Sequence, residues 1–329
     1  MPFYSRRNMM HIGDAVASAL SNAFKHPTQS EPQLVANLVF EFPKQINKAI
    51  CPGTMKVTAG GVFVHSRPFV ACKSFPQPTP ASVEIGDLLL IRTLVVSGKV
   101  VENRALLLQA KKTDSIPVIP DNKNQWHLYE QWPGFTYAPR SGGLTGKPRH
   151  IKEPDMYEAS KYLLIGTGSA ALGQYCACCS YWPFHWHCHL PEIGLHHTAQ
   201  PTRPKISRYK CFAGDLVDFI AGNAGKVFVK PKPRTRGWNR VIQDLIDETA
   251  KAKTIFIGRA AGQSTSAMRG NGVLFCSLAG HSSFSLFGGG DDGAANNVDK
   301  TPNVPAEWNG DDNGGGISII EFVVEQGEG

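Results

Sequence analysis

The sequence predicts an α/β fold in which a mixed central sheet is flanked by helices, followed by a less regular α+β C-terminal half. Residues 31–166 support this, because their periodicity predicts a helix, three strands, a helix and a strand in that order. Beyond residue 166 the pattern loosens. We therefore divide the chain into an N-terminal arm (1–30), a core (31–170) and a Cys/His- and Gly-rich C-terminal region (171–329) that could form a second subdomain.

Composition and charge narrow the class of protein. The chain has 329 residues, 42% of them hydrophobic, which suits one large domain or two modest ones. It lacks the twenty or so consecutive apolar residues of a membrane span, and its N-terminus lacks the features of a signal peptide. We therefore expect a soluble cytoplasmic protein without a membrane partner, with its eight cysteines as thiols or metal ligands. Basic clusters at 203–210 and 226–240 indicate either a phosphate-binding surface or a solvated face.

The first predicted element of the core is a helix from about Pro32 to Ile50. The first thirty residues have no clear period and are predicted to form an arm or a short helix. In the core helix, Pro32 suits the first turn, whereas Pro43 predicts a kink or a break. Its apolar stripe recurs at helical spacing and consists of Leu34, Leu38, Phe42 and Ile46.

Three strands and a second helix follow. Residues 60–72 alternate and predict a strand or hairpin, and 83–96 predict a long strand that pairs in antiparallel fashion with 104–112 across a turn at Ser97 and Gly98. A helix is predicted from Asn122 to Trp132, and a strand over 161–166.

The C-terminal region has weaker signals. Helices are predicted over 212–222 and 237–252, and strands over 254–258, 272–280 and 316–326. Residues 287–316 are rich in Gly, Asp and Asn, which predicts a long mobile loop.

Polar side chains end the third predicted strand of the core. Alternation places Leu107, Gln109 and Lys111 on one face, and Asp87 leads into the neighbouring strand. Taken alone, the segment also fits a buried strand that ends in solvent. A carboxylate, an amide oxygen and the backbone carbonyl of Ala110 would offer hard oxygen ligands for Mg²⁺ or Mn²⁺, and a nearby ammonium could orient water and stabilise negative charge.

These residues resemble the PD-(D/E)XK nuclease superfamily, which has a restriction endonuclease-like core. That family carries an acid on the second strand and an acid-x-lysine motif on the third, matched by Asp87 and by Gln109-Ala110-Lys111. Glutamine in place of the acid is similar to the Mrr-like variant, and it removes one negative charge from the site. The resemblance implies a Mg²⁺- or Mn²⁺-dependent nuclease that acts on DNA, with a role in restriction or anti-phage defence.

Further site residues follow from the same resemblance. Gln125 and Tyr129 have the Q-x-x-x-Y spacing of RecB-like and Cas4-like members, and positions four apart share one helical face. The resemblance thus implies a catalytic set of Asp87, Gln109, Lys111, Gln125 and Tyr129. We expect Glu84 as a further metal ligand if a bulge at Gly86 re-aims it, with Glu41 on the first helix as the alternative.

A cysteine- and histidine-rich segment could bind structural Zn²⁺, since thiolates and imidazoles are the ligands that zinc prefers. Its spacing matches no standard zinc finger, and the alternative is a buried aromatic-rich hairpin. The candidate ligands are Cys176, Cys178, Cys179, His185, His187, Cys188 and His189, with His196 and His197 nearby.

Two further classes compete with the nuclease. A nuclease-like core that has lost useful metal binding would be a non-catalytic module for nucleic acid or a protein partner. The chain could also be an assembly protein, a homo-oligomer built through the Cys/His region.

Overall fold

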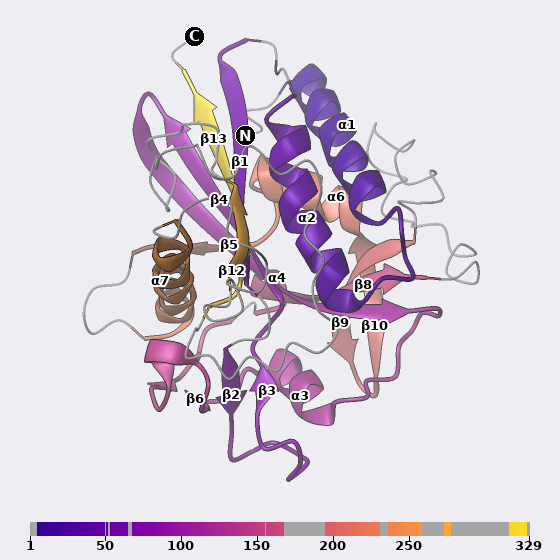
Figure 1. Cartoon of the computed structure of the whole chain (residues 1–329), viewed down its shortest axis with the longest axis vertical. Coiled ribbons are helices and arrows are strands. Elements are labelled where there is room, and N and C mark those ends of the chain that lie inside the picture. Colours follow the sequence, from indigo (N-terminus) through magenta and orange to yellow (C-terminus); the bar gives the residue numbers. More distant parts are fainter. Residues whose placement is uncertain are drawn as a thin grey trace.

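The computed structural model describes residues 5–49, 51, 53–64, 68–154, 156–167, 195–230, 236–257, 273–277 and 316–327. These residues build a nine-stranded mixed sheet with helices on both faces, and a smaller four-stranded sheet below it (Figure 1). The predicted fold class is therefore confirmed. No helix in these ranges combines the length and apolar character that a bilayer span requires.

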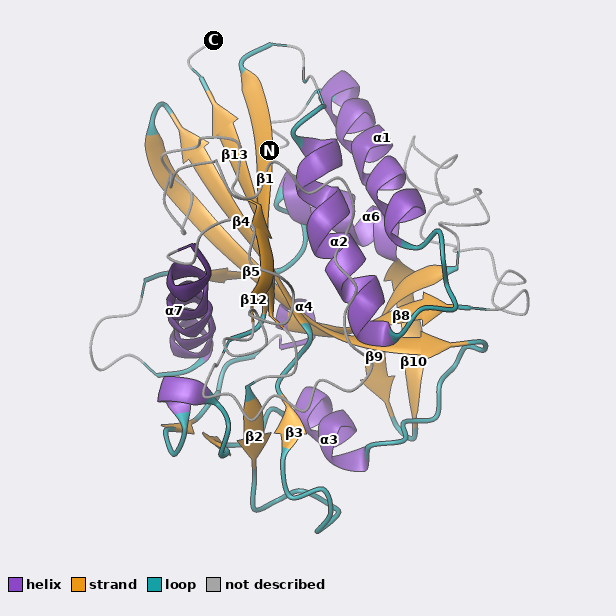
Figure 2. Cartoon of the chain, in the orientation of Figure 1, coloured by secondary structure: helices purple, strands orange, loops and turns teal. Residues whose placement is uncertain are grey.

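Three helices cover one face of the large sheet. They are α1 (Arg6–Ala23), α2 (Glu31–Ile46) and α6 (Phe212–Ala221), and Figure 2 shows α1 beside α2 over the strands. The expected N-terminal arm thus contains an 18-residue helix capped by Ser5. Its buried stripe of Ile12, Val16 and Leu20 has helical spacing, but intervening Ala, Ser and Asn residues dilute the signal.

Helix α2 begins and ends differently from the prediction. Ser30 caps it by accepting a hydrogen bond from the Gln33 N–H, and Pro32 lies in its first turn as predicted. The predicted interruption at Pro43 is wrong in so far as the helix continues through it to Ile46. Because Pro43 lies in the last turn, with Phe42 and Ile46 buried around it, packing outweighs the lost hydrogen bond.

The large sheet has the order β10-β9-β8-β5-β4-β13-β1-β12, with β11 paired to β5. Strands β4 and β5 form the predicted antiparallel pair, and β8 lies parallel to β5. The bounds are β1 Met55–Val64, β4 Leu88–Val96, β5 Lys99–Thr113, β8 Ser160–Gly166, β9 His196–Thr202, β10 Lys205–Cys211, β11 Lys226–Phe228, β12 Val273–Ser277 and β13 Ser318–Gln326.

The smaller sheet splits two of the predicted strands. Its order is β3-β2-β6-β7, with β2 at Phe69–Ala71, β3 at Val83–Glu84, β6 at Phe135–Tyr137 and β7 at Pro148–Arg149. The single strand predicted over 60–72 is therefore wrong, because β1 and β2 lie in different sheets. The long strand predicted over 83–96 is wrong for the same reason, since β3 and β4 are separated by Ile85, Gly86 and Asp87.

The C-terminal half contributes to the same large sheet. Strand β13 lies between β1 and β4, antiparallel to β1 and parallel to β4. Strands β9 and β10, which the sequence analysis missed because they are polar and contain Pro and Lys, extend the opposite edge. The described strands after residue 171 therefore share a sheet with the core.

The other face of the large sheet carries α7 (Trp238–Ile257) and α3 (Lys123–Gln131), together with the one-turn α4 (Met156–Ala159) and the 3₁₀ turn η1 (Gly142–Leu144). The strand predicted over 254–258 is wrong, because α7 runs through its first four residues. Helix α3 confirms its prediction. Asn122 caps it by accepting hydrogen bonds from the N–H groups of Asn124 and Gln125.

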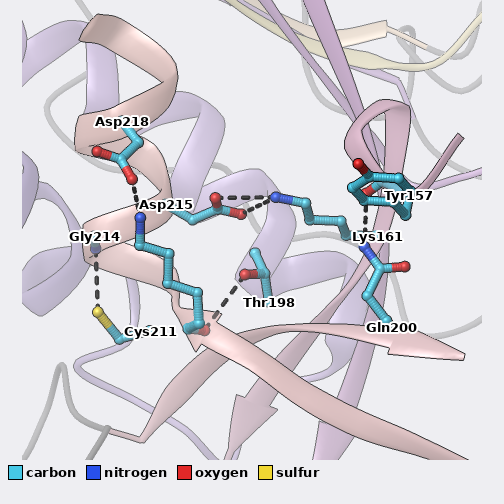
Figure 3. Close-up of polar contacts among 9 residues, drawn as sticks. Tyr157, Lys161, Thr198, Gln200, Cys211, Gly214, Asp215 and Asp218 are labelled. Atoms are coloured by element: carbon cyan, nitrogen blue, oxygen red, sulfur yellow. Dashed lines mark hydrogen bonds and ion pairs between the residues drawn. The ribbon is translucent and has the colours of Figure 1, made fainter. Parts of the chain in front are cut away.

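Helix α6 is fastened to the sheet by a buried ion pair. Lys161 of β8 donates to both carboxylate oxygens of Asp215, at 3.0 and 2.8 Å (Figure 3), and neither side chain is more than 2% exposed. Lys210 pairs with Asp218 one turn further along the helix. Lys161 and Lys210 therefore stabilise the packing of α6 against the sheet.

Candidate active site

Asp87 and Gln109 meet where strands β4 and β5 pair. Leu88 lies opposite Leu108 in the ladder, and the Asp87 N–H donates to the Leu108 carbonyl at 2.9 Å, so Asp87 faces Gln109 across the strands. The Asp87 Oδ2 accepts from the Ala110 N–H at 2.7 Å and from the side-chain amide of Gln109. The structure thus brings together two residues that the sequence placed on neighbouring strands.

Glu84 reaches the same place from β3. The short break between β3 and β4 turns the chain, and the Glu84 and Asp87 carboxyls share a hydrogen bond. Gly86 allows this turn to lie close to the sheet, since a Cβ there would be 2.7 Å from Leu107 Cδ1 and 3.0 Å from the Tyr129 hydroxyl. The expectation that Gly86 would re-aim Glu84 agrees with this placement, although a change of sheet rather than a bulge produces it.

Helix α3 contributes two polar side chains to the site. Gln125 Nε2 donates to Gln109 Oε1 at 2.6 Å and approaches the Glu84 backbone carbonyl at 3.4 Å. The Tyr129 hydroxyl donates to the Ile85 carbonyl at 2.9 Å, and its ring packs on Tyr162 of β8. Both members of the Q-x-x-x-Y pair therefore contact the segment that carries Asp87.

Lys111 and Glu31 form the open side. Lys111 Nζ lies 3.9 Å from Glu31 Oε1, and the side chains are 33% and 27% exposed. Glu31 Oε2 accepts from the Lys112 N–H at 3.0 Å, and Lys112 Nζ donates to the Gln29 carbonyl at 2.6 Å. Strand β5 thus holds the first residue of α2 beside the site, where solvent can reach it.

The structure does not bring Glu41 to the site. Its carboxylate pairs with Lys44 at 3.7 Å and accepts from Gln45 at 3.1 Å on its own helix. Glu41 is ten residues after Glu31, which is about 15 Å along a helix. The acid that α2 supplies is Glu31, which the sequence analysis missed. No local signal separates Glu31 from Glu41, because only the packing of α2 shows which of its ends meets β5.

Burial and mutual repulsion raise the pKa values of the three acids. Burial, followed by the charge of Glu84, holds the pKa of Asp87 well above its usual range, and burial likewise raises the pKa of Glu84. Burial and the charge of Asp87 raise the pKa of Glu31 to about 7. Lys111 opposes all three shifts. Burial and the neighbouring negative charges therefore disfavour the ionised form of each acid.

The donor set fits a divalent cation of the Mg²⁺ type. Within the described ranges no group of three or more His, Cys, Asp or Glu residues is close enough to form a ready-made metal cage. Mg²⁺ does not need one, because it keeps several waters and is commonly held by one or two carboxylates. The Glu84 and Asp87 pair, with its shared hydrogen bond, is such a set, and the Gln109 amide lies next to it.

The zinc candidates cannot be placed, because Cys176, Cys178, Cys179, His185, His187, Cys188 and His189 lie outside the described residues. The neighbouring His196 and His197 are buried in β9, where the His196 ring packs on Phe24 with centroids 3.9 Å apart.

Several cations of the basic clusters have acidic partners. Arg203 forms a two-bond pair with Glu130, at 2.6 and 3.0 Å, and Lys226 lies 3.8 Å from Glu153. Lys210 pairs with Asp218. These cations are less available to phosphates than the sequence suggests.

Comparison of the chain with protein-family models, with curated proteins and with solved structures gives no significant match. The candidate site therefore stands on the geometry of its own residues.

Proposed function

We propose that this chain is a metal-dependent nuclease that hydrolyses phosphodiester bonds in DNA, with Mg²⁺ or Mn²⁺ as its cofactor. The observation that carries the proposal is the convergence of Asp87, Gln109 and Lys111 on one face of β4 and β5, beside Glu84 and Glu31. Restriction or anti-phage defence in the cytoplasm is the setting that this activity would suit.

The residues divide into ligands and charge-stabilising groups. Glu84, Asp87, the Gln109 amide oxygen and the Ala110 carbonyl would hold the cation, which when bound activates water and neutralises charge on the phosphate. Lys111, partly exposed, stabilises the negative charge that develops on the phosphoryl oxygens. Glu31 holds the ammonium of Lys111 in place, and its pKa of about 7 suits proton exchange with water near neutral pH. Gln125 and Tyr129 keep Gln109 and the Glu84–Asp87 turn in position.

Cleavage of supercoiled plasmid with Mg²⁺ or Mn²⁺ tests the proposal. We expect Asp87→Ala and Lys111→Ala each to lower the cleavage rate by about a hundredfold or more, as loss of a ligand or of a charge-stabilising group does in other enzymes. Lys99→Ala is the matched control, because it removes an exposed lysine from the far end of the same strand. Parental activity that survives both site substitutions would contradict the proposed site.

A non-catalytic DNA-binding module is the second candidate. It is favoured by one contact, the donation from the Gln109 amide to Asp87, which satisfies the acid without a cation. On this alternative, DNA retention in a gel-shift assay is independent of divalent cations and unchanged in Asp87→Ala, and plasmid is not cleaved.

A further inference from the structure

The amide of Gln109 is held at both ends. Its Nε2 donates to Asp87, and its Oε1 accepts from Gln125 Nε2 at 2.6 Å. Gln109 is 1% exposed and Gln125 5% exposed, so water does not compete for these contacts. The three side chains form one directed chain of hydrogen bonds from Gln125 through Gln109 to Asp87.

The direction of this chain follows from the chemistry of its groups. A carboxamide has an oxygen on one side and an NH₂ group on the other. Turning Gln109 alone would place its oxygen against the Asp87 carboxylate and its NH₂ group against that of Gln125. Both contacts would be repulsive. The orientation of each amide is therefore set by the other and by Asp87.

In this orientation Gln109 cannot be a metal ligand. The amide oxygen points to Gln125, and its NH₂ group occupies the Asp87 oxygen that a cation would share. To place its oxygen beside Asp87, the side-chain amide of Gln109 must rotate by about 180°, which directs its NH₂ group at Gln125. Gln125 must then turn as well and present its own oxygen, giving up the 3.4 Å approach to the Glu84 carbonyl.

We propose that Gln125 is a positioning residue that couples cation binding to a joint rotation of the two amides. In the cation-free arrangement Gln109 satisfies Asp87 through its N–H, and in the loaded arrangement Gln109 turns its oxygen to the cation while Gln125 accepts from its N–H. This inference rests on the proposed function and deepens it, because it names how loading of that site is regulated. A glutamate at position 109 would lack the N–H group that closes the cation-free arrangement.

Mn²⁺ binding, measured by the loss of the free-ion signal in electron paramagnetic resonance, tests the coupling. Gln125→Glu has only acceptors at its end, so it holds Gln109 with its oxygen towards Asp87. We expect it to bind Mn²⁺ about tenfold more tightly than Gln131→Glu does, the effect of one hydrogen bond to a charged group. Gln131→Glu is the matched control, since it adds the same charge at an exposed position of α3. Equal affinities in these two variants would overturn the inference.

A second measurement needs no folded variant of Gln125. In the parent labelled with ¹⁵N-glutamine, we expect the side-chain NH₂ signals of Gln109 and Gln125 to shift together when Mg²⁺ is added. A shift of Gln109 without Gln125, or of neither while Mg²⁺ binds, overturns the joint rotation and leaves the nuclease proposal standing. If the parent binds Mn²⁺ no better than Asp87→Ala does, the proposed function itself fails.

Discussion

The side-chain amide of Gln109 donates a hydrogen bond to the carboxylate of Asp87, and the same carboxylate oxygen accepts from the Ala110 N–H at 2.7 Å. A half-buried acid at the start of a core strand is thereby satisfied by the chain itself. Ionising Asp87 is nevertheless unfavourable, because burial and the neighbouring Glu84 raise its pKa.

Asp87→Asn is expected to stabilise the protein at pH 7.5 while it abolishes cation binding. The amide keeps an oxygen for the Ala110 N–H but carries no desolvated charge, so we expect a gain of about 1 kcal/mol in the free energy of unfolding. Urea unfolding measures this, with Asp114→Asn, an exposed aspartate just after β5, as the control. A variant less stable than the parent would show that the charged form of Asp87 stabilises the fold.

Glu31 should make the stability depend on pH. Its pKa is raised in the folded state from 4.5 to about 7, so the protonated form favours folding. This contribution is fully present below pH 4.5 and is lost as the pH rises through about 7. The raised pKa values of Glu84 and Asp87 act in the same direction.

We therefore expect the midpoint of urea unfolding to fall between pH 5 and pH 8, and to fall less in Glu31→Gln. Glu41→Gln is the matched control for loss of a carboxylate from the same helix. If the midpoint falls with pH as steeply in Glu31→Gln as in the parent, Glu31 does not hold a proton in the folded state.

The Lys161–Asp215 pair predicts a strongly non-additive pair of substitutions. Lys161→Met leaves the carboxylate of Asp215 buried without its partner, which should cost about 3–5 kcal/mol. The double variant Lys161→Met, Asp215→Leu removes both charges and should recover most of that loss. Thermal or urea unfolding of the four proteins of the cycle measures the coupling. Additive losses would mean that the two residues act independently.

Asn124 should control the order of the loop between β2 and β3. Its buried side chain donates to the carbonyls of Gln77 and Pro80, at 2.7 and 2.9 Å, and accepts from the Gln77 N–H at 2.9 Å. Asn124→Ala leaves these backbone groups without the partner, and we expect a loss of about 2 kcal/mol. Hydrogen exchange should accelerate at the Gln77 amide.

Asn122→Ala is the control for Asn124→Ala, because it removes only the cap of the same helix, at a cost of about 1 kcal/mol. If the Gln77 amide exchanges equally fast in both variants, fraying of α3 rather than loss of the Asn124 contacts loosens the loop.

Much of the candidate site followed from local periodicity. Alternation along a strand was sufficient to place Gln109 and Lys111 on one face, and a spacing of four was sufficient to pair Gln125 with Tyr129. These relations depend on backbone geometry within one element, so neighbouring residues alone determine them.

Other features required contacts between distant parts of the chain. Strand β13 lies beside β4 although more than two hundred residues separate them, and its apolar run would suit many positions in a sheet. The choice of Glu31 over Glu41 depends on which end of α2 packs against β5, which the helical period does not encode. The 60–72 and 83–96 segments likewise change sheets without a change in pattern.

The sequence by itself therefore determined the fold class, the α3 cap and the set of polar side chains on the β4–β5 face, because these follow from periods of two and 3.6 residues. Only the tertiary structure decided that Glu31 and Glu84 join Asp87, and that the Gln109 amide turns its N–H to Asp87 and its oxygen to Gln125. The physical reason is that desolvation and hydrogen-bond direction depend on groups brought together by folding rather than by adjacency in the chain.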